Sequence, residues 1–241
     1  MSTARPLAGR LALVTGASRG IGAAVARRLA LSGARVALLA RSAHTLAALV
    51  AEIGDGAVAL VCDVRDTGAL SRALDSLPEL LGGAPGIVVN NAGAFFVAPA
   101  RDTSVDAFAA TLAVNLTAPF AVVRALLPAM SASREGHVVT IGSIADRMAF
   151  PGNAAYAASK YGLRALHEVL RAELKASGVR VSLVSPGPVD TDLWNSIDPD
   201  QQAGFTPRSE MLSPESVAEA VHWVVTSPAG VNVDELRLSR S

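Results

Sequence analysis

Short apolar runs alternate with longer segments of helical periodicity along the whole chain. Residues 11–15 (Leu-Ala-Leu-Val-Thr) are apolar at nearly every position, which is typical of a strand buried on both faces of a sheet. The pattern predicts strands over residues 11–15, 36–40, 58–62, 86–90, 137–141, 179–184 and 233–238. It predicts helices over residues 21–32, 42–53 with Ser42 as the cap, 66–77, 105–130, 154–176 and 214–225.

Strands that alternate with helices in this way predict a parallel sheet, because parallel strands need long crossovers and the crossovers are usually helices. We expect an α/β fold: a single Rossmann domain over residues 1–241, with a doubly wound, parallel, seven-stranded sheet and helices on both faces. A polar, proline-containing loop over residues 186–212 precedes the last helix, and residues 188–212 are predicted to form a substrate loop. The sequence contains no repeat and no linker that would support a second domain.

Composition and charge narrow the class of protein. The chain has 241 residues, 51% hydrophobic and 17% charged, so it can bury a large core and is not intrinsically disordered. Its 21 Lys+Arg balance 21 Asp+Glu, which argues against nucleic acid or an anionic membrane as the main partner. The most apolar stretch, residues 107–123, contains Asn115 and Pro119 and suits a buried helix better than a bilayer. Arginines interrupt any signal-peptide pattern and the single cysteine, Cys62, cannot form an intramolecular disulfide, so we expect a cytoplasmic protein.

Three glycines, Gly16, Gly20 and Gly22, lie between the first predicted strand and the first predicted helix. Glycines let the backbone approach a pyrophosphate, while the free N–H groups and the dipole of a helix N-terminus hold its charge. The spacing, G-x-x-x-G-x-G, differs from the G-x-G-x-x-G of two-domain dehydrogenases. We therefore predict a dinucleotide site at this turn.

The second predicted strand ends in Ala40, Arg41 and Ser42, where an NAD site would place Asp or Glu to bind the ribose 2′-hydroxyl. An arginine can instead pair with a 2′-phosphate, and Arg19 in the glycine turn can approach the same group from the other side. We therefore predict NADP(H) as the cofactor. The alternative is that both arginines are merely solvated.

Polar residues also end the third and fourth predicted strands, in the crevice where ligands bind to an open α/β sheet. Asp63 could accept a hydrogen bond from the adenine amine or, equally, cap the following helix. In the segment Asn90-Asn-Ala-Gly93, Asn90 could tie neighbouring strand ends together, and Gly93 leaves room for a ribose.

Tyr156 and Lys160 carry the strongest catalytic signal. Residues four apart face the same way on a helix, and Lys160 is one of only two lysines in the chain. A fixed positive charge beside a phenol favours the phenolate, so we expect Lys160 to lower the pKa of Tyr156. Ser143 follows the fifth strand, where its hydroxyl could hold a carbonyl oxygen. Asn115 lies inside a long helix, a poor place for asparagine unless its side chain or a loosened backbone carbonyl binds a water.

In order and spacing, these motifs together with Pro186-Gly-Pro-Val-Asp-Thr191 resemble those of the classical short-chain dehydrogenase/reductase family over essentially the whole chain. The resemblance implies hydride transfer between NADP(H) and a small-molecule carbonyl or secondary alcohol. It implies that Tyr156 is the general acid/base and that Ser143 orients and polarises the carbonyl oxygen. Lys160 would lower the pKa of Tyr156 and bind the nicotinamide ribose, and Asn115 would hold a water in a proton relay.

Two sets of site residues follow from the motifs and the resemblance. The catalytic set is Asn115, Ser143, Tyr156 and Lys160. The predicted cofactor contacts are Gly16, Ser18, Arg19, Gly20, Ile21, Gly22, Ala40, Arg41, Ser42, Cys62, Asp63, Val64, Asn90, Ala92, Gly93, Tyr156, Lys160, Pro186, Gly187, Val189 and Thr191.

The resemblance also bears on assembly and substrate. It implies a homotetramer, with a dimer as the alternative, packed through helices around residues 107–130 and 154–176. The C-terminus, residues 231–238, lacks the glycine-rich ending common among acyl-carrier-protein reductases of the family and is more similar to the branch acting on 3-hydroxy acids and serine-like substrates. Both 3-hydroxy acid and 3-oxoacyl substrates stay open.

Other candidate residues leave alternatives. Arg147 and Arg208 could meet a substrate carboxylate or be solvated, and Trp194 could cover the substrate or only pack. We expect no catalytic metal, because the histidines have no carboxylate or cysteine at ligand spacing; they are His44, His137, His167 and His222. A non-catalytic NADP-binding sensor or interaction protein on the same fold is the rival function, although a sensor would not need the catalytic set.

Overall fold

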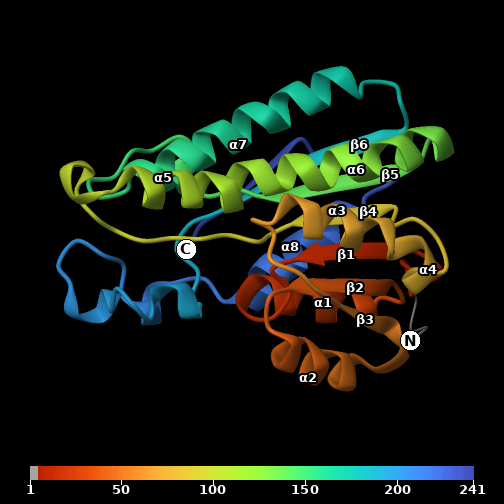
Figure 1. Ribbon diagram of the computed structural model, residues 1–241, viewed down its shortest axis with the longest axis horizontal. Helices are drawn as coiled ribbons and strands as arrows, with labels where there is room; N and C mark the ends of the chain where they lie inside the picture. Colours follow the sequence, from red (N-terminus) through yellow and green to blue (C-terminus); the bar gives the residue numbers. More distant parts are fainter. Residues whose placement is uncertain (1–4) are drawn as a thin grey trace.

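Seven parallel strands form one sheet in the order β3-β2-β1-β4-β5-β6-β7 in the computed structural model, which describes residues 5–241 (Figure 1). The expected doubly wound α/β fold is confirmed. The order reverses between β1 and β4, so the crevice at the carboxyl ends of these two strands is the place where a ligand is expected. The strands are β1 (Leu11–Thr15), β2 (Arg35–Ala40), β3 (Ala57–Val61), β4 (Ile87–Asn90), β5 (Gly136–Ile141), β6 (Val179–Pro186) and β7 (Glu235–Leu238).

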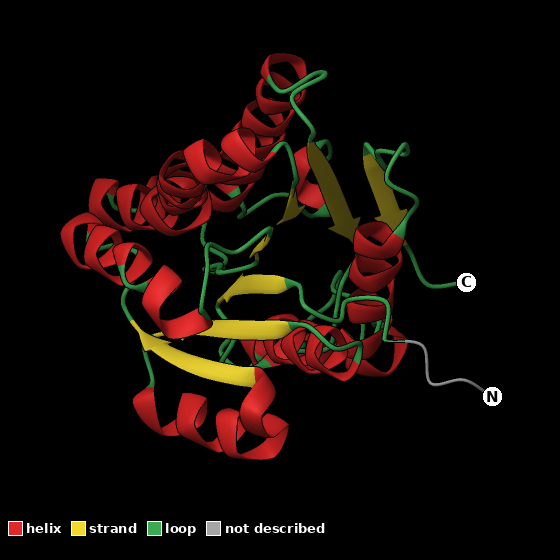
Figure 2. Cartoon of the chain, turned by 90° about the vertical axis from the view of Figure 1, so that its right-hand side faces the viewer, coloured by secondary structure: helices red, strands yellow, loops and turns green. Residues whose placement is uncertain are grey.

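Helices cover both faces of the sheet (Figure 2). One face carries α1 (Gly20–Leu31), α2 (Ala43–Ile53) and α8 (Pro214–Thr226). The other face carries α3 (Thr67–Asp75), α4 (Leu77–Leu81), α6 (Ala118–Ser133) and α7 (Ala154–Glu173), with α5 (Val105–Leu112) packed against α7. Side chains along a strand alternate between the two faces, as strand geometry requires. In β1, Val14 packs on the face covered by α1, α2 and α8, and Leu13 packs on the face covered by α3, α4, α6 and α7. The near-continuous apolar runs in the sequence are therefore explained by burial on both sides.

Two predicted helices are interrupted. The helix predicted over residues 66–77 is two helices, α3 and α4, and Asp66 caps the first while Pro78 sits in the first turn of the second, where its missing N–H costs nothing. The helix predicted over residues 105–130 contains a π turn, Ala113–Thr117, between α5 and α6. A proline lies close to each break, and a prediction based only on the spacing of apolar residues does not take proline into account.

The run Val105–Ser133 is the one helical segment of the described chain that is long and apolar enough, by those criteria alone, to cross a membrane. In the structure it packs against α7 and against β4 and β5. Core helices of soluble proteins meet the same criteria, so this run is weak evidence for a membrane span.

Candidate active site

The carboxyl ends of β1, β4, β5 and β6 bring the predicted site residues to one edge of the sheet. The turn after β1 carries the glycines and leads into α1, and the segment after β6 passes beside it: a Cβ on Gly20 would lie 3.1 Å from Cγ2 of Thr191. That segment is pinned to the last strand, because the backbone N–H of Gly187 donates to the Leu238 carbonyl over 2.8 Å. The glycine turn and the segment after β6, both predicted to contact the cofactor, are therefore neighbours.

The backbone of the glycine turn is packed too closely to leave room for a side chain at Gly16 or Gly22. A Cβ on Gly22 would lie 2.3 Å from the Gly16 carbonyl oxygen and 2.4 Å from Nδ2 of Asn91, and one on Gly16, whose φ is +66°, would lie 2.8 Å from the Cα of Ala92. Within the described residues, no side chain caps the first turn of α1, where Arg19 is the N-cap residue. The N–H groups of that turn are therefore available to an anion, as a phosphate site requires.

Replacement of Gly22 by alanine is expected to weaken NADPH binding about tenfold, because the added methyl group must displace the Gly16 carbonyl by an amount that costs on the order of 1 kcal/mol or more. Titration of NADPH fluorescence measures the dissociation constant. Gly230→Ala is the matched control, since its Cβ would enter open space. Unchanged affinity in Gly22→Ala would contradict the assignment of this turn to the phosphates.

Asn91, and not Asn90, ties the ends of β1 and β4 together. Its Nδ2 donates to the carbonyls of Thr15 (2.9 Å) and Gly16 (3.2 Å), while Oγ1 of Thr15 accepts from the backbone N–H groups of Asn91 and Ala92, each at 3.0 Å. The prediction for Asn90 was wrong in this respect, because the amide that joins the two strand ends belongs to Asn91, the residue directly after β4. The buried Asn90 side chain has no hydrogen-bond partner within residues 5–241.

Arg41, predicted to select the cofactor, follows β2, and Arg19, predicted to act with it, lies in the glycine turn after β1. Arg41 is exposed, and Arg19 is 3.6 Å from Asp192 in the segment after β6. Asp63 pairs with Arg65 over 2.7 Å, and this hydrogen bond, helped by the positive charge of Arg41, holds the pKa of Asp63 below its ordinary value. Asp63 does not cap the following helix, because that cap is Asp66, whose Oδ1 accepts from Ala69 N–H at 2.8 Å. Of its two predicted roles, only the adenine contact stays a prediction.

The other residues predicted to contact the cofactor lie around this crevice, and their contacts stay predictions. Ser42 is the N-cap of α2, as expected, and its hydroxyl accepts from the N–H of Thr45. Ala40, Cys62, Val64, Pro186 and Val189 are buried, whereas Ser18, Ile21, Ala92, Gly93 and Gly187 are partly exposed or exposed.

Tyr156 and Lys160 lie on the first turns of α7, beside the end of β5. The buried Lys160 ammonium donates to the Ile141 carbonyl over 2.9 Å and lies 5.7 Å from the centre of the Tyr156 ring. Burial lowers the pKa of Lys160 from 10.5 to about 8, and the nearby Asp146 carboxylate opposes that shift.

The pKa of Tyr156 is raised, which is the opposite of the expected direction. Burial disfavours the phenolate, and the hydrogen bond with Ser143 only partly compensates. Lys160 is directed at a backbone carbonyl rather than at the phenol oxygen, so its charge does not reverse the shift. Tyr156 is thus a protonated phenol at neutral pH, which is the form that can donate a proton.

Ser143 and Asn115 are both buried and are held by backbone groups. Ser143 begins a 3-10 turn (Ile144–Asp146), where its hydroxyl accepts from Ala145 N–H at 3.1 Å. Asn115 lies in the π turn, and its side chain is occupied: Oδ1 accepts from Ala94 N–H at 2.7 Å, and Nδ2 donates to the Ala94 carbonyl. Four residues further on, Pro119 has no N–H to donate to the Asn115 carbonyl. The sequence offered either the side chain or the backbone carbonyl of Asn115 as the group that binds a water. Because the side chain is already hydrogen-bonded to Ala94, the prediction that remains is the backbone carbonyl.

A buried acidic network beneath the site was missed in the sequence. Asp146 accepts from Ser185 Oγ at 2.6 Å and from Arg147 Nε at 2.7 Å, and Arg147 also pairs with Glu235 on β7 over 2.5 Å. Arg147 is therefore neither solvated nor free for a substrate. No local pattern marks this network, because its members come from three different segments of the chain.

Arg208 is likewise paired, contrary to both alternatives considered for it. Its guanidinium donates to Asp190 Oδ1 and to Asn195 Oδ1, each at 2.6 Å, so it braces the loop after β6. Trp194 in the same loop packs against Phe95 with 5.1 Å between ring centres, and Phe95 packs against Tyr156 at 4.8 Å. The Phe95 ring therefore lies between the Trp194 indole and the Tyr156 ring.

Among residues 5–241 there is no group of three or more His, Cys, Asp or Glu side chains that could hold a metal.

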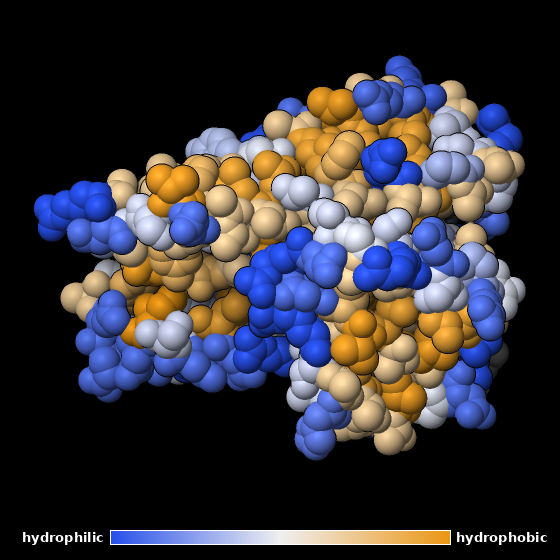
Figure 3. Space-filling model, viewed as in Figure 1, coloured by the Kyte–Doolittle hydropathy of each residue, from blue (hydrophilic) through white to orange (hydrophobic). Residues whose placement is uncertain are grey.

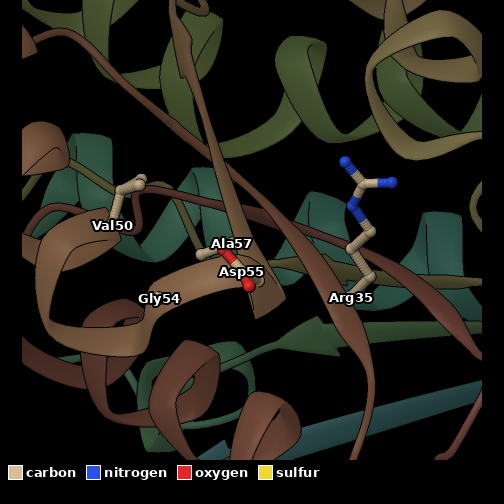
Figure 4. A pocket seen from close by; sticks show the side chains of 5 residues that line it. All are labelled: Arg35, Val50, Gly54, Asp55 and Ala57. Atoms are coloured by element: carbon tan, nitrogen blue, oxygen red, sulfur yellow. The ribbon is translucent and has the colours of Figure 1, made fainter.

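An open hollow lies away from this site, at the opposite edge of the sheet, where β2 and β3 begin (Figure 4). It is lined by Arg35, Val50, Gly54, Asp55 and Ala57, and none of the predicted site residues belongs to it.

Fold and site together define an oxidoreductase class, and comparison with known proteins agrees: the chain belongs to the short chain dehydrogenase family, whose pattern matches residues 10–202. It is 34% identical over 233 residues to the NADP-dependent 3-hydroxy acid dehydrogenase YdfG of Salmonella typhi, covering 95% of this chain and 94% of that protein. It is 36% identical to glycine betaine reductase ATRR of Emericella nidulans over 96% of this chain, but it spans only 19% of that longer protein. The closed form of serine dehydrogenase complexed with NADP+ superposes with a TM-score of 0.88 at 35% identity, covering 95% of this chain and 94% of the other.

Proposed function

We propose that this protein is an NADP(H)-dependent oxidoreductase that interconverts a carbonyl compound and a secondary alcohol, with Tyr156 as the general acid and base. The observation that carries the proposal is the convergence of a protonated phenol, the Ser143 hydroxyl and the buried Lys160 beside the closed glycine turn. The orphaned Asn90 side chain and the uncapped first turn of α1 fit a nucleotide in the crevice between them. Relatives and structural neighbours that carry NADP in their names support the choice of cofactor.

The bound NADPH would supply the hydride, and the chain would supply binding, orientation and the proton. Ser143 would orient the carbonyl oxygen of the substrate, and Tyr156 would donate its proton to that oxygen. Lys160, an ammonium below its pKa of about 8, would hold positive charge beneath the phenol. The carbonyl of Asn115, to which Pro119 has no N–H to donate, would hold a water through which the proton on Tyr156 is replaced from solvent.

The substrate types named for relatives include a 3-hydroxy acid, and a 3-oxoacyl compound would present the same carbonyl chemistry. Exposed apolar side chains on α6 and α7, among them Phe120, Tyr161 and Val169, support association of these helices in a homotetramer or a dimer. Hydrophobic residues are visible on this helical layer at the top of Figure 3. We also propose that the substrate is a small molecule and that the protein is located in the cytoplasm.

The proposal is tested by incubating the purified protein with NADPH and a panel of keto acids, β-keto esters, aldehydes, quinones and steroids, and following the loss of NADPH absorbance. Turnover of at least one carbonyl compound is expected. NADPH binding without turnover of any of them would favour the rival reading of a sensor on the same fold.

Replacement of Arg41 by alanine is expected to weaken NADPH binding about 10- to 100-fold, the value of a charge-assisted hydrogen bond to the 2′-phosphate, and to leave NADH binding unchanged. Isothermal titration with each nucleotide measures both affinities. Arg101→Ala is the control, because Arg101 is an exposed arginine after β4 whose partner is Asp102. Equal affinity for NADH and NADPH in the parent protein would contradict the choice of cofactor.

A further inference from the structure

A row of aromatic rings leads outward from the catalytic phenol. Tyr156 meets Phe95 at 4.8 Å between ring centres, Phe95 meets Trp194 at 5.1 Å, and Trp194 meets Phe205 at 6.1 Å, all edge to face. The rings come from α7, from the segment after β4 and from the loop after β6. The indole is fixed, because its Nε1 donates to the Val189 carbonyl over 3.0 Å. One wall of the approach to Tyr156 is therefore built of ring edges and faces.

The segments that flank this ring wall carry further apolar side chains. The segment after β4 runs beside the segment that precedes α7, where Ala98 N–H donates to the Gly152 carbonyl at 2.9 Å. Large apolar side chains in these segments are exposed: Met148 (49%), Phe150 (39%) and, on the loop, Leu193 (38%). Figure 3 shows hydrophobic residues facing the hollow between the helical layer and this loop, which is the blue segment at the left of Figure 1.

The arginines of the two stretches that border the approach are already paired. Arg147 is held by Asp146 and Glu235, and Arg208 by Asp190 and Asn195. Within residues 143–153 and 187–212 these are the only arginines, and neither stretch contains a lysine.

The loop itself is acidic. Residues 187–212 contain Asp190, Asp192, Asp198, Asp200 and Glu210 against the single Arg208. Along these two stretches a substrate carboxylate would therefore meet several carboxylates and no arginine or lysine without a partner, whereas a neutral aromatic group would meet the ring wall.

Building on the proposed function, we propose that this site selects carbonyl compounds that bear an uncharged aromatic group next to the reacting carbon, with Trp194 as a specificity-determining residue, and discriminates against keto acids. A substrate ring would extend the row of rings and contact Phe95 and Trp194 edge to face, the arrangement that aromatic pairs prefer. The proposed preference differs from the 3-hydroxy acid in the name of one relative.

Three substrates separate charge from ring. Methyl benzoylformate carries a ring and no charge, benzoylformate carries the same ring and a carboxylate, and methyl pyruvate carries neither ring nor charge. With NADPH saturating, kcat/KM for methyl benzoylformate is expected to exceed each of the other two at least tenfold. A value for benzoylformate equal to or above that of its ester would overturn the proposal while leaving the proposed function intact. If NADPH binds and none of the three is reduced in spite of turnover with another carbonyl class, the proposal also fails.

Variants of Trp194 test the role of the ring wall. Trp194→Ala is expected to remove most of the preference for methyl benzoylformate over methyl pyruvate, and Trp194→Phe is expected to restore it, while both bind NADPH as the parent does. A loss of folding would lower kcat/KM for both esters equally and would be seen in the circular dichroism spectrum. A Trp194→Ala protein that folds, binds NADPH and keeps the full preference would refute the role of Trp194.

Discussion

Tyr156→Phe is expected to lower kcat for carbonyl reduction by a factor of roughly 10²–10⁴, the usual contribution of a positioned general acid, and to change the dissociation constant of NADPH little. The variant removes the hydroxyl proton that the proposed mechanism gives to the carbonyl oxygen, while the ring that packs on Phe95 is kept. Because burial raises the pKa of Tyr156, the parent enzyme holds this proton throughout the neutral range. Single-turnover measurement with saturating NADPH separates this chemical step from binding.

Tyr161→Phe provides the matched control, since Tyr161 lies on the same helix, is 46% exposed and contacts none of the catalytic residues through its hydroxyl in the described structure. Its kcat is expected to equal that of the parent. A Tyr156→Phe protein that binds NADPH and reduces carbonyls at the parent rate would contradict the mechanism. Equal losses in both variants would point to a disturbance of α7 instead.

The fold could be predicted nearly in full because each of its determinants is local or periodic. Strands buried on both faces produce continuous apolar runs, and the ends of the predicted strands lie within two residues of the observed ones. The glycine turn was equally readable, because close backbone approach leaves no alternative residue type at Gly22. The helix breaks at residues 76 and 113–117 were missed since apolar periodicity continues through both.

Tertiary partners explain what the sequence could not reveal about the site. Whether Asn90 or Asn91 faces β1 depends on the register of two strands that are far apart in the chain. The direction of the pKa shift of Tyr156 depends on how deeply α7 packs, and a lysine at i+4 says nothing about burial. Arg147 and Arg208 looked free in the sequence because the pair of Arg147 with Glu235 joins distant parts of the chain and the pair of Arg208 with Asp190 forms only when the loop after β6 folds back on itself.

Asp146 supplies the most consequential of these missed interactions. It is 1% exposed, and its carboxylate is shared by Ser185 and by Arg147, which in turn reaches Glu235 on the last strand. The network therefore joins the turn that carries Ser143 to the edge of the sheet. It also places a negative charge near Lys160, where it supports the protonated ammonium against burial.

Asp146→Asn is expected to destabilise the protein by about 3 kcal/mol, because it leaves a half-buried guanidinium with one carboxylate instead of two. For a domain of this size the melting temperature should fall by roughly 6–12 °C. Asp102→Asn is the matched control: it also removes the partner of a neighbouring arginine, but the pair of Arg101 and Asp102 is exposed and is worth less than about 1 kcal/mol. Equal melting temperatures for the two variants would contradict the structural weight given to the buried pair.

The pH profile separates this packing role from an electrostatic one. Asp146 raises the pKa of Lys160, so its replacement should move that pKa below the parent value of about 8. Lys160 would then lose its charge at lower pH, and Tyr156, whose pKa Asp146 also raises, would lose its proton at lower pH, so the alkaline limb of the kcat profile for reduction should shift toward neutral pH in Asp146→Asn. A purely structural effect would lower stability and leave the position of that limb unchanged, so a stationary limb would show that Asp146 does not act on the site through Lys160.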